Sequence, residues 1–391
     1  MVGVTRGLSG PTIGSEERAL LIATIRGFGE EHVQPRVAEY DRTETLPLDL
    51  LAQTAQLGIF GGTIPEEWGG AGMDHVTFAE VLIELSRFDH ALACLVSMPS
   101  ALVGGGLLAF GSDEQRERWL KPLARGEIFG AAGVTEPRSG TDVAGMETTY
   151  RREGEGFVIQ GAKTWISNLD IASFFVTFAT HDRSLKHRGI SAFVIPADTS
   201  GLSVHPITNK LGFRPLCSGE LVLDDVYVGP EALIGEEGQG FLVAMQQVER
   251  GRLGVAARAV GMAQMCLDDS ITYAQQRIVF DQPISEYQLT QRKIAGMATE
   301  IEAARALTLR CADALDRGDR GRVEASMAKM YATDVLQRVA TEAVQIHGAY
   351  GASDEYRVGR AYRDAKVFQI VEGTNDLHQL LIAQYALGMR K

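Results

Sequence analysis

Apolar side chains recur at helical spacing through the first 130 residues. Ser15 opens an amphipathic run whose apolar face is formed by Leu21, Ile22, Ile25 and Phe28. Residues 48–55 and 78–85 carry a similar apolar pattern, and the Gly- and Pro-rich segment between them predicts turns. We therefore predict an N-terminal helical domain over residues 1–130.

The pattern changes between residues 131 and 240. Apolar and polar positions alternate at residues 174–178, 190–194 and 221–223, which predicts strands. Pro, Gly and Asn recur about every dozen residues, as is typical of a small antiparallel sheet or barrel. The strand–helix alternation of a doubly wound fold is missing. We expect a middle β domain over residues 131–240.

Long helical periodicities return after residue 240. Residues 243–277 and 285–306 show them, and one apolar stripe runs through Met327, Tyr331, Val335, Val339, Ala343 and Ile346. Long antiparallel helices with short links predict a four-helix bundle over residues 241–391. The expected fold is thus mainly α with a central β domain.

Residues 91–110 carry no charge and are long enough to span a bilayer. Pro99 and the glycines at 104–106 interrupt this segment, and Asp89 and His90 precede it without a basic cluster. We predict two short core helices around a turn, and no membrane span.

Composition and charge narrow the function classes. The chain has 391 residues, of which 45% are hydrophobic and 23% charged, as in a globular protein of two or three domains. A net charge of −12 argues against nucleic-acid binding. The four cysteines are scattered, so neither a zinc site nor a disulfide framework is expected. Residues 1–18 show no apolar signal-peptide region, and a cytoplasmic location is the default expectation.

Two motifs of the middle region carry candidate chemistry. Residues 133–142 (GVTEPRSGTD) combine small residues, which allow close approach to a ligand, with hydroxyl donors. No GK[ST] follows, so the motif is not a P-loop, and a plain turn is the alternative. In residues 163–168 (KTWISN), Trp165 beside Ser167 can stack on a flat ring and donate to its edge, although a core Trp is the alternative.

A third motif lies near the C-terminus, at residues 371–376 (VEGTND). Thr374 or Asn375 can cap a final helix, which is the structural interpretation. Glu372 follows an apolar run, and a carboxylate among apolar side chains has a raised pKa that suits a general base. The motif alone leaves both interpretations open.

Taken together, these motifs resemble the acyl-CoA dehydrogenase family. The three motifs, with residues 249–252, 277–280 and 345–348, follow the order and approximate spacing of that family from about residue 15 to 388. The resemblance implies an N-terminal helical domain, a middle β domain and a C-terminal four-helix bundle. It also implies FAD as cofactor, assembly as a homotetramer, an electron-transferring flavoprotein as electron acceptor, and no metal.

The resemblance assigns the cofactor residues. The flavin is assigned to Ala132, Val134, Thr135, Gly140, Thr141, Trp165 and Ser167. The adenine half, which reaches a neighbouring subunit in this family, is assigned to Arg277, Phe280, Gln288, Gln345, Ile346 and Gly348. Thr374 and Asp376 lie where the family closes on the cofactor. Asp281 and Ala349 stand where relatives commonly have Gly, which puts the nucleotide end in doubt.

The resemblance also implies a reaction. Glu372 would remove the alpha proton of an acyl thioester while hydride passes from the beta carbon to flavin N5, giving a trans-2-enoyl thioester. The substrate contacts would come from Thr141, Glu249, Arg252 and Gly373. Gly251 occupies the place where some relatives carry their base, so Glu372 has no rival there.

The substrate is less defined. The C-terminal segments are similar to the glutaryl-CoA branch, which holds a distal carboxylate with an Arg of an N-terminal helix. Ala93 occupies that place here, so we expect an apolar acyl chain of short or medium length. Coenzyme A and an acyl carrier protein stay open as carriers. A flavin-dependent oxidase or monooxygenase on the same fold is the second function class.

Overall fold

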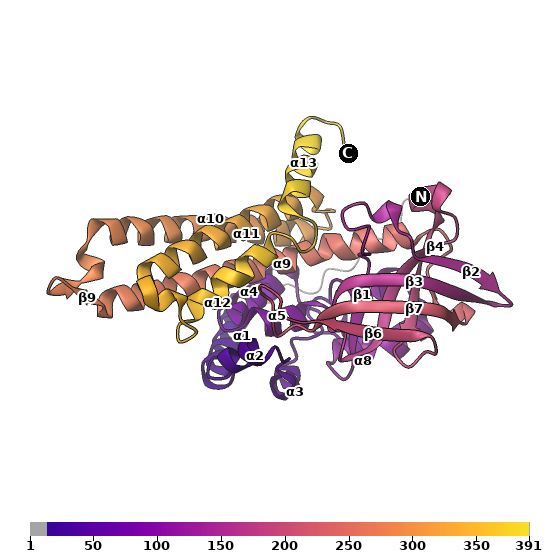
Figure 1. Ribbon diagram of the computed structural model, residues 1–391, viewed down its shortest axis with the longest axis horizontal. Coiled ribbons are helices and arrows are strands. Elements are labelled where there is room, and N and C mark those ends of the chain that lie inside the picture. Colours follow the sequence, from indigo (N-terminus) through magenta and orange to yellow (C-terminus); the bar gives the residue numbers. More distant parts are fainter. Residues whose placement is uncertain (1–13, 391) are drawn as a thin grey trace.

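The computed structural model describes residues 14–390, and its three parts follow one another along the chain (Figure 1). Helices come first, a sheet follows, and long helices close the chain. This order confirms the expected fold class. The expectation that no signal peptide is present concerns mostly residues 1–13, which lie outside the described range.

Among residues 14–128, the structure has eight α-helices. They are α1 (Ser15–Phe28), α2 (Val37–Thr43), α3 (Leu48–Gln56), α4 (His75–Ser86), α5 (His90–Ser97), α6 (Gly104–Phe110), α7 (Asp113–Gln115) and α8 (Lys121–Ala124). Aspartates cap the two most buried helices: the Asp74 carboxylate accepts the N–H of Thr77 at 2.6 Å, and Asp89 caps α5. The caps define where α4 and α5 begin, and both helices pack against α9 (Gly240–Gln276).

The uncharged segment 91–110 forms two short helices, α5 and α6, as predicted. A Cβ at Gly104 would lie 2.0 Å from the carbonyl oxygen of Pro99, so only glycine lets this turn close onto α6. Among residues 14–390, no helix is both long and apolar enough to cross a membrane.

The middle part is one eight-stranded sheet. Its strands are β1 (Phe129–Gly133), β2 (Thr149–Glu153), β3 (Gly156–Ser167), β4 (Ala172–Thr180), β5 (Ile190–Pro196), β6 (Leu202–Ile207), β7 (Ser218–Val228) and β8 (Leu233–Ile234). The order is β6-β7-β3-β2-β4-β5-β8, with β1 alongside β4. Most neighbours are antiparallel, as predicted, but β4 pairs in parallel with β1 and, at one point, with β2.

Strand β4 departs from its predicted alternation. Phe174, Val176 and Phe178 are buried as expected, but the opposite face, with Phe175 and Ala179, is buried as well. The first set packs in the core shared with the helices, while the second packs in the separate core that the sheet encloses. The strand is therefore covered on both faces, which alternation along the sequence does not reveal.

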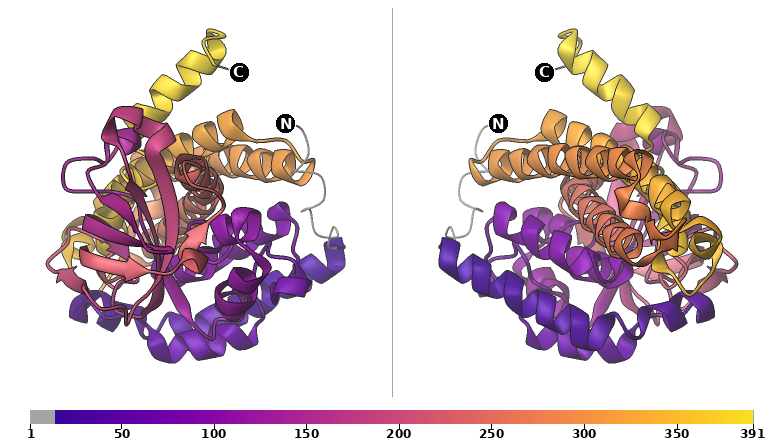
Figure 2. Two further views of the ribbon diagram at one scale, coloured as in Figure 1. Left: turned by 90° about the vertical axis from the view of Figure 1, so that its right-hand side faces the viewer. Right: turned by 90° about the vertical axis from the view of Figure 1, so that its left-hand side faces the viewer.

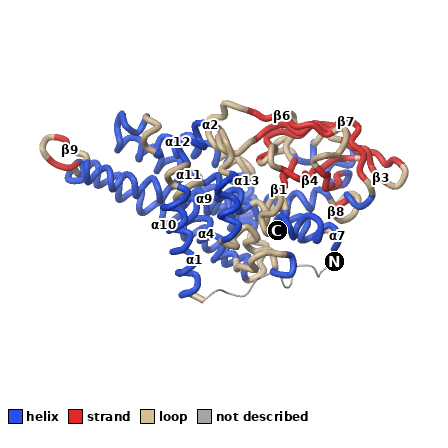
Figure 3. The backbone as a smooth tube through the Cα atoms, turned by 90° about the horizontal axis from the view of Figure 1, so that it is seen from below, coloured by secondary structure: helices blue, strands red, loops and turns tan. Residues whose placement is uncertain are grey.

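Long helices complete the molecule. They are α9 (Gly240–Gln276), α10 (Gln288–Asp316), α11 (Arg322–His347), α12 (Arg357–Phe368) and α13 (Asn375–Ala386), and a small hairpin of β9 (Ile278–Val279) and β10 (Gln282–Pro283) joins α9 to α10. Helices α10, α11 and α12 pack on α9, and so do α4, α5 and α6. Helix α13 contacts α11 and projects from the body of the molecule (Figure 2). The sheet lies at one end of the molecule and the β9 hairpin at the other (Figures 1 and 3).

One buried polar cluster joins all three parts. His90 of α5 lies with Nε2 3.1 Å from the carboxylate of Asp364 on α12. The other carboxylate oxygen accepts the backbone N–H of Phe213, in the β6–β7 loop, at 2.7 Å. The Phe213 ring packs on His90 and on Phe368. Because each partner comes from a different part, this cluster fixes their relative positions.

Candidate active site

Glu372 lies in the short loop between α12 and α13 and faces α9. Two consecutive left-handed residues, Glu372 (φ 54°) and Gly373 (φ 89°), turn the backbone there. A Cβ built at Gly251 of α9 would lie 2.6 Å from the Glu372 Oε1. A non-glycine residue at 251 would therefore compete with the carboxylate for the same space.

Charges surround this partly exposed carboxylate. Burial raises the pKa of Glu372 to about 7, against the opposing pull of Arg252 and Arg258 of α9 and Lys329 of α11. A carboxylate with such a pKa is ionised in a large fraction of molecules at neutral pH and is still a strong enough base to accept a proton. The arrangement meets the electrostatic requirement for a general base.

The loop is held from beneath by Lys329, which the sequence analysis did not single out. Its side chain is 0% exposed. Its Nζ donates to the carbonyl oxygen of Gly373 at 2.8 Å, to Asn375 Oδ1 at 2.9 Å and to the carbonyl oxygen of Gln369 at 3.3 Å. Three acceptors and no donor complement an ammonium group, although burial lowers the pKa of Lys329 to about 7. A lysine among buried alanines of α11 is the sequence signal that could have revealed it.

Helix α5 links this loop to the sheet. Cys94 of α5 lies beside Arg258 and within the electrostatic influence of Glu372, and burial raises the pKa of its thiol. One turn later, the sulfur of Met98 lies 2.8 Å from the side-chain amide of Asn168, which follows β3. The C-terminal loop and the end of β3 are thus both neighbours of α5.

The two motifs of the middle region meet each other. The backbone N–H of Thr164 donates to the carbonyl oxygen of Thr135 at 2.8 Å. Lys163 and Glu136 form a buried ion pair at 2.7 Å. Glu136 also accepts the backbone N–H of Thr148 at 3.0 Å. The pair anchors the loop after β1 to strand β3.

Trp165 has the form of a ring-covering residue. It lies at a register irregularity of β3, has a φ of 59°, and its side chain is 61% exposed. A large aromatic held in this conformation with an open face can stack on a planar ligand. Ser167 on the same strand and Thr135, whose carbonyl oxygen accepts the N–H of the neighbouring Thr164, are partly exposed, and a Cβ at Gly140 would have no neighbour closer than 4.0 Å. These residues fit the ring of a flavin.

The remaining residues of the β-domain motifs differ in exposure. Ala132 and Val134 are partly buried and Thr141 is exposed. At the C-terminal loop, the Thr374 hydroxyl accepts the N–H of Leu377 and caps α13, so the structural interpretation of Thr374 holds, and Asp376 is exposed in the first turn.

The residues assigned to the adenine half are separate from these in one chain. Phe280 is 89% exposed in the β9–β10 hairpin, at the end of the bundle opposite the sheet (Figure 1). The guanidinium of Arg277 lies 5.9 Å from the ring centroid of Tyr350, beyond α11. Gln288, Gln345 and Gly348 are exposed, and the side chain of Ile346 is buried in the core, leaving its backbone for contacts.

The two substrate candidates on α9 differ in whether a partner is present. Glu249 forms an ion pair of 2.7 Å with Arg322 of α11. Arg252 is 7% exposed, and its Nε reaches no acceptor among residues 14–390. Within the same range, no group of three or more His, Cys, Asp or Glu side chains could hold a metal ion, and all four cysteines are free.

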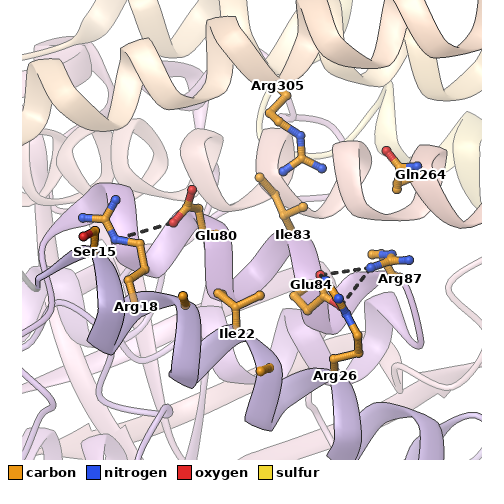
Figure 4. A pocket seen from close by; sticks show the side chains of 12 residues that line it. Ser15, Arg18, Ile22, Arg26, Glu80, Ile83, Glu84, Arg87, Gln264 and Arg305 are labelled. Atoms are coloured by element: carbon orange, nitrogen blue, oxygen red, sulfur yellow. Dashed lines mark hydrogen bonds and ion pairs between the residues drawn. The ribbon is translucent and has the colours of Figure 1, made fainter.

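A cavity of about 530 Å³ lies elsewhere, between α1, α4 and α10 (Figure 4). Ion pairs line it: Arg26 contacts Glu84 at 2.8 Å, and Arg87 contacts the same carboxylate at 2.9 Å. None of the motif residues lines this cavity. Size alone therefore does not identify the functional site of this protein.

Comparison with known proteins bears on the whole chain. Three family models match, described as the N-terminal, middle and C-terminal domains of acyl-CoA dehydrogenase, over residues 15–127, 131–226 and 238–387. The 3-(aryl)acrylate reductase of Clostridium sporogenes is 36% identical over 95% of this chain and 99% of its own. The human mitochondrial short-chain specific acyl-CoA dehydrogenase is 37% identical over 95% of this chain and 90% of its own.

A solved structure agrees with these relatives. Butyryl-CoA dehydrogenase from Megasphaera elsdenii has a TM-score of 0.93 at 36% identity, covering 96% of this chain and 99% of that chain. The sequence motifs, the three-part fold and the matches along the full described length lead to one family. The chain belongs to the acyl-CoA dehydrogenases, which are FAD-dependent oxidoreductases.

Proposed function

We propose that this protein oxidises an acyl thioester between its alpha and beta carbons, with Glu372 as the base. The observation that carries the proposal is the Glu372 carboxylate, which faces Gly251 in a partly open site and has a pKa of about 7. Some relatives carry their base at the position of Gly251. Here a glycine leaves that space to Glu372.

The chemistry requires help for a weak carbon acid. An alpha C–H bond beside a thioester ionises only if the developing oxyanion is stabilised. Among residues 14–390, no group accepts the backbone N–H of Glu372, which leaves it to donate to the thioester carbonyl. The alpha proton then passes to the Glu372 carboxylate, and the beta carbon loses a hydrogen with its electron pair as the double bond forms. Bound FAD supplies the two-electron acceptor.

The chain's own residues would hold that cofactor. Trp165 would cover one face of the ring, with Ser167 donating to its edge and Thr135 approaching from the loop after β1. Their exposure and geometry support this role. Arg277 and Phe280 lie too far along the bundle to join them within one chain, so we propose that a second copy supplies them (Figure 1).

A short acyl chain and a coenzyme A carrier are the proposed substrate features. The names of the relatives support them, because one is short-chain specific and another acts on butyryl-CoA. The reductase relative does not change the assignment of Glu372, because the reverse reaction passes through the same transition state. An electron-transferring flavoprotein is the proposed electron acceptor.

Anaerobic flavin reduction tests this function. The holoenzyme is mixed with a panel of acyl thioesters of graded length, each as the CoA ester and as the carrier-protein conjugate, and flavin absorbance is followed. Bleaching by short acyl-CoA within the turnover time is expected. Bleaching only by carrier conjugates would reassign the carrier. Rapid peroxide formation in air would instead support the oxidase class.

A further inference from the structure

Arg258 is a buried cation without a carboxylate of its own. Its side chain is 5% exposed, and its Nη1 finds no acceptor among residues 14–390. Burial of a charged group that lacks a partner is costly, so such groups are usually paired or serve a ligand. The guanidinium therefore calls for an explanation outside the packing of the protein.

The position of Arg258 relates it to the reacting atoms. Its Nε donates to the carbonyl oxygen of Gly254 at 3.3 Å, which bends the side chain back along α9 toward Gly251. Gly254 and Gly251 are separated by about 4.5 Å along the helix axis. Gly251 faces the Glu372 carboxylate, and Arg258 lowers the pKa of that carboxylate. Arg258 thus bonds to the stretch of α9 next to the residue that faces the proposed base.

The surroundings hold the guanidinium without neutralising it. The ring of Phe368 on α12 lies 5.5 Å from its central carbon, close enough for a cation–π contact. The Cys94 thiol on α5 lies beside it and has a raised pKa, which keeps it neutral. Arg258 also interacts electrostatically with the Glu372 carboxylate, which the reaction itself requires. Nη1 thus remains a donor that no group among residues 14–390 uses.

We propose that the acyl group of the substrate carries a carboxylate at its far end and that Arg258 binds it. This inference rests on the proposed function, because it places the alpha and beta carbons beside Glu372. A guanidinium matches a carboxylate with two parallel hydrogen bonds, and a dry site strengthens that contact. Gly254, which accepts the Nε–H of Arg258, and Gly251, which faces the base, are only about 4.5 Å apart along α9, so we expect a short acyl chain.

A carboxylated acyl group differs from the apolar acyl chain expected from the sequence. An apolar acyl chain was expected because Ala93 stands where the glutaryl-CoA branch has its arginine. Ala93 is fully buried in α5 and offers no charge. Arg258 of α9 offers a guanidinium instead, and this group lies beside Cys94, the residue that follows Ala93 on α5.

Binding of unreactive substrate analogues tests the inference separately from catalysis. CoA thioesters with sulfur in place of the beta carbon cannot be dehydrogenated. The analogues are made in pairs that differ only in ending with a carboxylate or a methyl group. Their acyl chains have roughly four to six atoms, because Gly251 and Gly254 are close together along α9. Dissociation constants are measured by calorimetry for wild-type holoenzyme, Arg258→Met, Arg258→Lys and Arg250→Met. The last removes another guanidinium of the same helix, one that lines a small cavity together with residues of α4 and α5.

We expect wild-type enzyme to bind the carboxylated member of at least one pair about 100-fold more tightly, as sites built for a polar group do. Arg258→Met should lose this preference, Arg258→Lys should keep part of it, and Arg250→Met should keep it. Wild-type enzyme that prefers the methyl-terminated analogues overturns the inference, even if Arg258→Met does not fold. A preference that persists in Arg258→Met also overturns it. Flavin that no thioester bleaches contradicts the proposed function, while this binding comparison still decides the role of Arg258.

Discussion

At the scale of single residues, the absence of a side chain at Gly251 leaves room for the Glu372 carboxylate. Gly251→Ala would place a methyl group 2.6 Å from Oε1, and the carboxylate would move because it ends a flexible side chain. We expect kcat to fall by about 10- to 100-fold through misplacement of the base. Unfolding free energy should change little, since the strain is relieved by that movement.

Stopped-flow flavin reduction and urea unfolding measure the two effects. Gly296→Ala on α10 is the matched control, because a Cβ there meets nothing within 4 Å. Unchanged flavin reduction in Gly251→Ala would show that the Glu372 carboxylate works elsewhere.

Lys329 should act on Glu372 through the loop and through its charge. Lys329→Met removes the ammonium donor to the carbonyl of Gly373 and one of two donors to Asn375 Oδ1, and it removes a cation that lowers the pKa of Glu372. The pKa of Glu372 should therefore rise. The acid limb of kcat/KM, where the base becomes protonated, should move to higher pH, with kcat reduced about tenfold.

The pH profile of kcat/KM with the preferred thioester is the measurement. Lys366→Met serves as control, because Lys366 is exposed and contacts only the side chain of Gln369. If Lys329 only supports the loop, kcat should fall without movement of the acid limb. That result would refute an effect of the Lys329 charge on the pKa of Glu372.

Motifs and lone residues differ in what sequence reveals about them. Glu372, Trp165 and their neighbours lie in short signatures, so a resemblance could assign them. Lys329 and Arg258 lie in long helices without a motif, and their roles depend on which distant segments pack against them. The apolar stripe predicted for residues 327–346 does not include Lys329, and periodicity cannot identify the partner of a buried charge.

At the scale of elements, the ion pair of Glu136 and Lys163 fastens the loop after β1 to strand β3. Both side chains are almost completely buried. Lys163→Met leaves a buried carboxylate without its cation and should cost about 3–5 kcal/mol of unfolding free energy. FAD retention should fall too, because Thr135 and Trp165 flank the pair in their two segments.

The double variant Glu136→Gln/Lys163→Met separates charge from packing. It should recover part of the lost stability in urea unfolding, since no unpaired charge remains. A double variant less stable than Lys163→Met by the full cost of a second substitution would mean that the two sites are independent.

The sequence predicted most elements because apolar periodicity is strong in long helices and in β4, β5 and β7. The interruption of residues 91–110 by Pro99 and three glycines was enough to predict two helices. Parallel pairing of β1 with β4 escaped prediction, because it joins strands separated by two others along the chain. The burial of the second face of β4 was also not predicted, because it depends on how the sheet closes.

At the scale of the whole molecule, the cluster of His90, Phe213 and Asp364 holds three parts together. Burial alone would raise the pKa of Asp364, but His90, Arg360 and the N–H of Phe213 lower it overall. A lowered pKa means that the ionised form stabilises the fold above the pKa of the unfolded chain and that this contribution is lost as pH falls through the folded value. Asp364→Asn should therefore cost about 2–4 kcal/mol at pH 7 and progressively less below about pH 4.

Urea unfolding at several pH values checks this expectation, with the exposed Asp354→Asn as control. A constant difference between wild type and Asp364→Asn across that pH range would contradict the linkage. The order of the three parts could be predicted from the sequence. This junction could not, because its members come from three separate segments.

The central claim is that Glu372 removes the alpha proton, and the rate of anaerobic flavin reduction in Glu372→Gln tests it most directly. Gln keeps the size of the side chain and cannot accept the proton, while the FAD-binding residues are untouched. With FAD content equal to wild type, the account predicts a rate of substrate-driven flavin bleaching lower by about 10²- to 10⁴-fold. A Glu372→Gln enzyme that bleaches its flavin within a few-fold of the wild-type rate would contradict the account.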